Sequence, residues 1–187
     1  RRTRKWDALA LSPKEAQLKI LLGHCQGAAK TEFGLTHRLG EVRTYEDFKE
    51  RVPLRKYAYF EPFIDRMRKG ARDVLWPGLV PYFGQSSGTS QTVAKNKFIP
   101  ISMEQVHWQQ MGGIDMISRY MHLTHDSTYT SGYSICLFPP STMTDEGPGV
   151  RLGTNPGIML RHYPRSARMA VLPKKPIRDM ENYDEKL

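Results

Sequence analysis

The sequence is poor in cysteine and contains no long hydrophobic run. Its cysteines, Cys25 and Cys136, lie far apart and not in a C-x-x-C spacing, which argues against a disulfide framework and against a structural zinc site. The longest apolar candidate, residues 134–138, is far shorter than the roughly 20 residues that a membrane helix needs. No charged and then apolar leader precedes a cleavage site. We therefore expect free, mostly buried thiols, no membrane segment and a cytoplasmic protein.

The sequence has fewer acidic than basic residues. Lys and Arg total 28 against 19 Asp and Glu, for a formal charge of +9, which favours anionic partners such as nucleotides, acyl carboxylates or nucleic acid. A solvated basic surface explains the clusters at residues 1–5 and 161–175 equally well. With 39% hydrophobic residues in 187, the chain is long enough for one domain with a buried core.

Helices are expected in the first part of the chain, over about residues 12–70. Ser12 followed by Pro13 and Glu15 is a capping signature for a helix to about Ala28. A second helix is capped by residues 44–47 and ended by Pro53, and a third starts at Glu61 and Pro62 and stops at Gly70. A stripe at helical spacing in the first helix reads as core rather than as a cofactor site. It consists of Leu18, Leu21, Leu22 and Cys25.

From residue 76 the pattern changes to strands. Residues 79–83 suit an edge strand, because proline and glycine punctuate a short apolar run, and residues 98–101 suit a second strand. Ser102, with Gln105 in the reciprocal position, caps a helix from Met103 to about Leu123. The order over about residues 79–124 is thus strand, loop, strand, helix, followed by a mixed strand and loop region over about 132–187. The predicted fold class is α/β.

The loop between these strands has the composition of a phosphate site. Triphosphate binding needs many short donors, which glycine permits by close backbone approach and which Ser and Thr hydroxyls supplement. A nearby lysine adds a point charge, and Lys95 and Lys97 are both available. The G-x-x-x-x-G-K-[ST] spacing is absent, and a flexible connection is the plain alternative. The donor set consists of Ser86, Ser87, Gly88, Thr89 and Ser90.

Residues 86–90, followed by a lysine and then by Phe98, Ile99 and Pro100, resemble the phosphate loop of the auxin-responsive acyl-acid amido synthetase family. Plant members of that family carry SSGTSxGxxK followed by a proline. The stretches 31–34, 45–47 and 59–70 are similar to the family ahead of its loop, and 155–161 resembles bacterial members. The resemblance spans roughly residues 18–175 and implies the fold of the adenylate-forming superfamily. Firefly luciferase and acyl-CoA synthetases belong to the same superfamily.

Two departures from the family pattern affect this reading. The glycine after TSx is not reproduced, and two additional residues precede the lysine. Anchoring on the strand that ends in proline selects Lys97, whereas counting from Ser86 selects Lys95, and we prefer Lys97 because a strand fixes register better than a loop.

The family's motifs YxxxExxxG and YRxGD are absent, since Asp65 stands where the first requires glycine after Tyr57 and Glu61. In the family these motifs lie further along the chain and supply carboxylates for magnesium and contacts to the ribose. We therefore interpret residues 1–187 as the N-terminal portion of a large adenylation domain, with a helical start followed by a mixed sheet with flanking helices, and as part of a longer protein.

The resemblance implies a ligase that uses ATP and Mg²⁺. A carboxylic acid attacks the α-phosphate to give an acyl-adenylate, and an amino acid or other amine then displaces AMP to form an amide. The loop would hold the β- and γ-phosphates, and no catalytic side chain is assigned within this chain. The helix from Met103 resembles one that borders the acyl pocket in relatives. Side chains of this helix could line that pocket, and core packing is the alternative role of each. These candidates are His107, Trp108, Met111 and Tyr120.

Metal and nucleic-acid sites are the remaining candidates. His122 and His125 have a spacing compatible with a metal pair, but a charge complement at a helix C-terminus is simpler. Asp145 and Glu146 read as a solvated loop rather than a magnesium site, so no metal ligand is assigned. A basic chain with tryptophans could bind nucleic acid, although no recognised motif supports this. A non-catalytic remnant or scaffold of the same fold is the other alternative.

Overall fold

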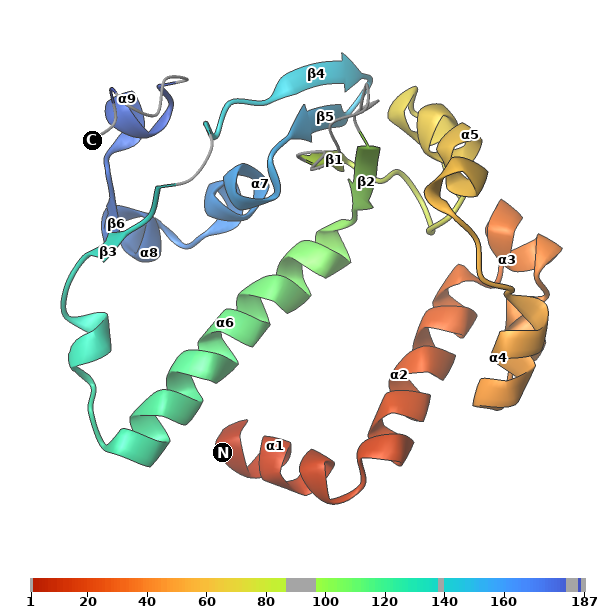
Figure 1. The fold of residues 1–187 in the computed structure, drawn as a ribbon, viewed down its shortest axis with the longest axis horizontal. Coiled ribbons are helices and arrows are strands. Elements are labelled where there is room, and N and C mark those ends of the chain that lie inside the picture. The colour runs from red at the N-terminus through yellow and green to blue at the C-terminus, as the bar shows by residue number, and fades with distance from the viewer. Residues whose placement is uncertain (1, 87–96, 138–139, 181–184, 186–187) are drawn as a thin grey trace. The chain divides into compact units, whose positions relative to one another are not determined.

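The computed structural model describes residues 2–86, 97–137, 140–180 and 185. The chain forms two compact units, and we describe each by itself. The first holds residues Arg1–Val80 and the turn Gly147–Val150, and the second holds Pro81–Glu146 and Arg151–Leu187. No helix in the described residues combines the length and the apolar composition needed to cross a membrane. Figure 1 shows the elements in chain order.

The first unit is helical, as predicted. The predicted first helix ends at Ala28 as expected, but Ser12 makes no side-chain capping bond, so that detail of the prediction is wrong. A preceding helix at the basic N-terminus was not predicted. The elements are α1 (Arg2–Leu11), α2 (Pro13–Ala28), α3 (Glu32–Thr36), the 3-10 turn η1 (Leu39–Glu41), α4 (Tyr45–Arg51) and α5 (Tyr57–Arg68).

The apolar stripe of α2 is core. Cys25 and Ala28 are buried together with Leu39 and Val42, and Leu21 and Leu22 pack against them. Leu18 is half-buried. Burial raises the pKa of the Cys25 thiol, because an apolar environment disfavours the thiolate. Both cysteines are free, with Cys25 buried and Cys136 partly buried.

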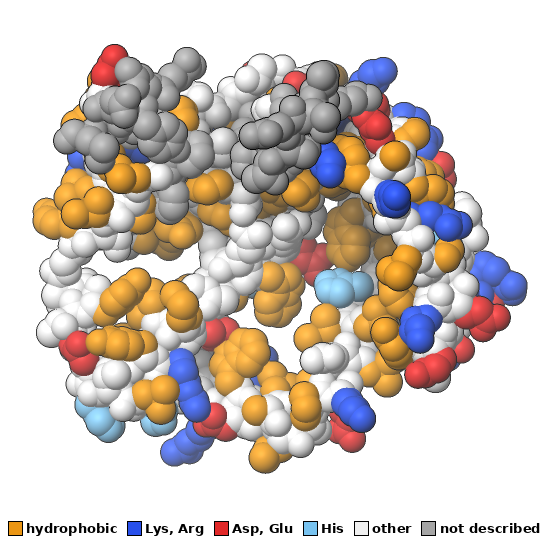
Figure 2. Space-filling model, viewed as in Figure 1, with side chains coloured by type: hydrophobic (Ala, Val, Ile, Leu, Met, Phe, Trp, Pro, Cys, Tyr) orange, Lys and Arg blue, Asp and Glu red, His pale blue; other side chains and the backbone are white. Residues whose placement is uncertain are grey.

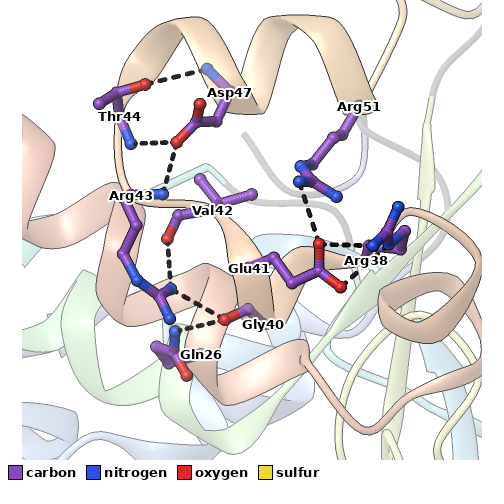
Figure 3. Close-up of polar contacts among 9 residues, drawn as sticks. All are labelled: Gln26, Arg38, Gly40, Glu41, Val42, Arg43, Thr44, Asp47 and Arg51. Carbon is purple, nitrogen blue, oxygen red and sulfur yellow. Dashed lines mark hydrogen bonds and ion pairs between the residues drawn. The ribbon is translucent and has the colours of Figure 1, made fainter.

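A network of charged groups ties the segment after α3 to α4 (Figure 3). Glu41 accepts ion pairs from Arg38 at 2.9 Å and from Arg51 at 3.1 Å. The predicted cap at residue 44 is confirmed: Thr44 accepts from the Asp47 N–H, and the Asp47 carboxylate accepts from the Thr44 N–H. Backbone N–H groups of Arg43 and Thr44 lower the pKa of Asp47, because they stabilise its charged form.

The third predicted helix starts earlier than expected. Helix α5 begins at Tyr57, not at Glu61, and Pro62 lies inside it. A proline inside a helix removes one backbone hydrogen bond. Here the aromatic rings of the first turns compensate by packing, since Tyr59 contacts both Phe60 and Phe63.

The second unit contains a four-stranded mixed sheet. Its order is β2-β1-β5-β4 (Figure 1), so the predicted edge strand at 79–83 is instead a central strand that starts at Tyr82. Pro81 has no N–H to offer, but its carbonyl accepts from Arg151 N–H at 2.9 Å and so opens the parallel pairing with β5. The strands are β1 (Tyr82–Ser86), β2 (Lys97–Ile101), β4 (Thr144–Gly147) and β5 (Val150–Gly153).

The start of α6 (Met103–Thr124) and the helix α7 (Asn155–His162) pack against this sheet. Helix α6 begins where Ser102 accepts from the Gln105 N–H at 3.1 Å, which confirms the predicted helix and its cap. The region 132–187 holds more helix than predicted. Its further elements are η2 (Thr128–Thr130), the parallel pair β3 (Ser134–Ile135) and β6 (Val171–Leu172), α7 (Asn155–His162), α8 (Arg165–Met169) and α9 (Lys175–Arg178).

The core of the second unit lies between β1, β2 and the helices α6 and α7. Tyr82 and Ile101 come from the strands, Val106 from α6, and Ile158 and Met159 from α7. Helix α7 is fixed at its start, where Thr154 accepts from the Gly157 N–H at 3.2 Å. The core therefore holds β1 directly against a capped helix.

Candidate functional site

The candidate site is the hairpin of β1 and β2. The strands pair antiparallel from Tyr82 opposite Ile101 to Ser86 opposite Lys97. The predicted loop residues Ser87, Gly88, Thr89, Ser90 and Lys95 lie outside the described residues. Ser86 and Lys97 are thus directly opposite each other where the loop begins and ends, and the Lys97 side chain is exposed.

The end of the β1–β2 hairpin extends past the neighbouring strand β5. Strand β5 pairs with β1 from Tyr82 to Gly84, where Gly84 lies opposite Gly153, and β5 ends there. The last pairs of the hairpin are Gln85 with Phe98 and Ser86 with Lys97. Next to the loop, β1 therefore pairs with β2 and no longer with β5. The position of β1 thus sets the position of the loop ends.

Two neighbouring side chains of β1 anchor it on opposite faces. Phe83 is fully buried and Tyr82 is 8% exposed. The Tyr82 hydroxyl lies 3.0 Å from Nε2 of His162 at the end of α7, and the two rings meet edge to face with centroids 5.3 Å apart. Desolvation by burial, and secondarily the positive charge of Arg161, lower the pKa of His162. The neutral imidazole is thus favoured.

The acyl-pocket candidates on α6 are spread along the helix. His107 and Trp108 are in ring contact with centroids 5.6 Å apart, and Met111 follows one turn later. Tyr120 lies about 20 Å further along the axis than His107, at 1.5 Å per residue, and hydrogen-bonds to Asp126 at 3.0 Å. Trp108 is 60% and Tyr120 42% exposed, and Met111 is half-buried. None of the four is buried in this chain, where Val106 is the buried residue of α6.

The metal candidates form no group of three possible ligands in the described residues. His122 and His125 are exposed at the end of α6, where His125 has a left-handed conformation. In the described part of the chain, no group of three or more His, Cys, Asp or Glu side chains could hold a metal ion. Asp145 pairs with Arg151 at 3.2 Å and is 82% exposed, as expected for a solvated group. It lies in strand β4, so the loop expected there is wrong.

Comparison with known proteins decides the family. A family model described as the GH3 family N-terminal domain matches residues 2–186. The chain belongs to the GH3 family. The resemblance seen in the sequence is thereby confirmed, and no curated protein sequence matches this GH3 chain significantly.

Solved structures confirm the fold class of this GH3 chain. A structure of "GH3.15 acyl acid amido synthetase" is similar with a TM-score of 0.75 and 20% identity, over 100% of this chain and 32% of that one. A structure of "AtGH3.15 acyl acid amido synthetase in complex with 2,4-DB" has a TM-score of 0.65 and 23% identity, over 84% of this chain and 27% of that one. The fold is the mixed α/β fold of the N-terminal part of these proteins, and the chain spans about a third of their length.

Sequence reasoning missed the Tyr82 and His162 pair. The two residues are 80 positions apart, and neither belongs to a motif. A buried tyrosine in the strand that leads to the loop was predictable, because 79–83 was read as apolar. Its partner was not, since the helix α7 was not predicted.

Proposed function

We propose that this GH3 chain is the N-terminal part of an enzyme that activates a carboxylic acid with ATP and joins it to an amine. The reaction has an acyl-adenylate intermediate and makes a C–N bond. The observation that carries the proposal is the β1–β2 hairpin, which joins Ser86 and Lys97 at the two ends of a loop with the composition of a phosphate site.

The proposed role of this loop is to hold the β- and γ-phosphates of ATP. Backbone N–H groups freed by Gly88 and hydroxyls of Ser86, Ser87, Thr89 and Ser90 match the many oxygens of a triphosphate. Lys97 supplies a positive charge, and its strand position opposite Ser86 supports it over Lys95, since pairing fixes it beside the loop. These groups would align pyrophosphate as a leaving group and stabilise its charge.

The proposed chemistry needs no nucleophilic side chain. The carboxylate oxygen of the acid attacks the α-phosphorus, the bond to the bridging oxygen breaks, and pyrophosphate leaves. The amine nitrogen then attacks the acyl carbon, AMP leaves, and the amine loses a proton. A related structure was solved with 2,4-DB, which supports a small acid as substrate. His107, Trp108 and Met111 are available on α6 for its apolar part, and Tyr120 stands apart from them.

Mg²⁺ would bind at this site as a complex with ATP. Bound Mg²⁺ would neutralise phosphate charge during transfer. We propose that carboxylates in the further motifs that the family resemblance implies, YxxxExxxG and YRxGD, would hold it together with the phosphates of ATP.

We also propose that residues 1–187 belong to a larger adenylation domain. Its parts would be the helical region 12–70, the hairpin with α6 over 79–124, and the region 132–187. Large hydrophobic side chains reach the surface over the face shown in Figure 2. Leu54, Met116 and Ile135 are 100%, 66% and 78% exposed. Such exposure is typical of a surface that packs against something else. The length of the matched structures supports further chain as the partner.

The test is ATP–pyrophosphate exchange by the full-length protein with a panel of carboxylic acids. We expect acid-dependent exchange, and we expect Lys97→Ala to lower it by about 100-fold, the cost of losing one charge-stabilising donor. Lys95→Ala, a matched lysine in the same loop, should cost much less. Lys19→Ala, on the exposed side of α2, should have no effect. Absence of exchange with every acid would favour the non-catalytic remnant, and a larger effect of Lys95→Ala would reverse the choice of lysine.

A further inference from the structure

Strand β1 leads into the loop. On the face of β1 that carries Tyr82, few side chains are present to hold the strand in place. Side chains alternate along a strand, so the next position on this face is Gly84, and the loop begins two residues further on. Gly84 lies opposite Gly153 of β5, which has no side chain either. Between Tyr82 and Ser86, this face of β1 therefore carries no side chain.

Tyr82 makes a directional contact as well as an apolar one. Its ring packs with Ile158 and Met159 of α7 in the core, and its hydroxyl hydrogen-bonds to His162 Nε2 at 3.0 Å. Apolar packing tolerates small sliding movements, whereas a hydrogen bond weakens steeply when its distance or angle changes. The hydroxyl contact thus adds a directional link between β1 and α7, beside the backbone pairing of β1 with β2 and β5.

Helix α7 is a firm partner for this contact. A Cβ atom added at Gly157 would lie 3.0 Å from Ser141 Cα and 2.9 Å from Thr154 Oγ1, so the start of the helix is in tight contact with residue 141. Gly157, Ile158, Met159 and Leu160 are all buried. A group fixed to the end of α7 is therefore fixed to the core of the second unit.

We propose that Tyr82 and His162 are positioning residues for ATP: their hydrogen bond holds β1, and through it the ends of the phosphate loop at Ser86 and Lys97, in the place that the phosphates require. Neither residue touches ATP in this arrangement. The inference rests on the proposed function, because it assigns the pair to the same loop. A displacement of about 1 Å at a reacting group can cost a large factor in rate, so a single buried hydrogen bond at the root of the loop has a measurable effect.

The experiment measures steady-state exchange by the full-length protein for Tyr82→Phe, His162→Phe, His162→Gln and the double variant Tyr82→Phe/His162→Phe. We expect each Phe variant to raise the KM for ATP by about five- to tenfold, the worth of one hydrogen bond, with the KM for the acid unchanged. The double variant should resemble either single one, because both remove the same bond. His162→Gln can still hydrogen-bond and should recover part of the ATP affinity.

Tyr59→Phe is the matched control. Tyr59 faces His37 in the first unit with 3.5 Å between hydroxyl and Nε2, so the control removes a hydroxyl from a similar pair that has no connection to β1. It should leave the KM for ATP as it is. Thermal unfolding of every variant shows whether it is folded.

The two ways of failing are distinct. If the wild-type protein exchanges and both Phe variants keep the wild-type KM for ATP while unfolding at lower temperature, the pair is structural alone and the inference is wrong. If the wild-type protein shows no exchange with any acid, the proposed function itself is wrong, and the inference falls with it.

Discussion

At the scale of single residues, the tightest position in the first unit is Gly34 in α3. A Cβ atom there would lie 1.9 Å from the Ala28 carbonyl oxygen, which is much closer than any atom can approach. The cause is Thr31, which is 1% exposed, donates to Ala28 O at 2.8 Å and accepts from Gly34 N at 3.0 Å. These two bonds draw the start of α3 onto the end of α2.

We predict that Gly34→Ala destabilises the full-length protein by at least about 3 kcal/mol, at the upper end of what overpacking costs. The reason is that backbone, not a flexible side chain, blocks the added methyl group. The measurement is the free energy of unfolding in urea. Gly23→Ala in α2 is the matched control, since nothing lies within 4 Å of its Cβ position. The control should be stabilising by about 0.5–1 kcal/mol because alanine favours a helix, and equal effects of the two substitutions would contradict the prediction.

At the scale of elements, one carboxylate connects the end of α9 to the segment before β4. Asp179 accepts from both the N–H and the hydroxyl of Ser141, at 3.0 and 2.6 Å, and its side chain is 15% exposed. Burial alone would raise the pKa of Asp179, but the Ser141 bonds and the charges of Arg178 and Lys175 outweigh it, and the pKa is lowered.

Because the folded pKa lies below the unfolded one, Asp179 stabilises the fold above the ordinary Asp value of about 4. This stabilisation is lost as the pH falls through the lower folded value. We predict that Asp179→Ala costs about 1–3 kcal/mol at pH 7 and much less at acid pH, where wild type has also lost the contribution. Urea unfolding at both pH values measures this. Asp145→Ala, at a carboxylate that is 82% exposed, should have little effect, and a pH-independent loss for Asp179→Ala would contradict the assignment.

The sequence predicts those elements whose signals are local. Helices α2, α4 and α6 were found at or near their observed ends, and a proline or a capping side chain lies at the start of each: Pro13, Thr44 and Ser102. Strand β1 was placed too early and at the edge, because its central position depends on β5, which lies some 70 residues later and pairs with it from Pro81 onward. Helix α5 was started too late because Pro62 was taken as its first turn.

In the candidate site too, local features could be predicted from the sequence and contacts between distant residues could not. A loop flanked by two strands was predicted, but the strands were placed at 79–83 and 98–101, whereas they extend to Ser86 and begin at Lys97. The contact of Tyr82 with His162 was not predicted, because it joins residues that are 80 positions apart and depends on tertiary packing. The distance of Tyr120 from His107, by contrast, already follows from the predicted helix at 1.5 Å per residue, and the structure confirms that helix.

At the scale of the whole molecule, large apolar side chains are exposed on several elements of the second unit. Trp108 and Met116 of α6 are 60% and 66% exposed, and Ile135 of β3 is 78% exposed. We predict that a protein of residues 1–187 alone binds a hydrophobic dye and self-associates, because exposed apolar patches favour association. The full-length protein should do neither. Dye fluorescence and light scattering compare the two, and a dye-free monomer of residues 1–187 would contradict the proposal that further chain covers these side chains.

The turn Gly147–Val150 has a consequence for the order in which the chain can fold. It belongs to the first unit: a Cβ atom at Gly149 would lie 3.0 Å from Leu79 Cδ2, and Val150 is fully buried. On the ribosome, residues 1–80 therefore emerge without the last piece of their own core and must wait for about 70 more residues, at some 5–20 residues per second. The helical unit can therefore become complete only after β1, β2 and β4 have been made.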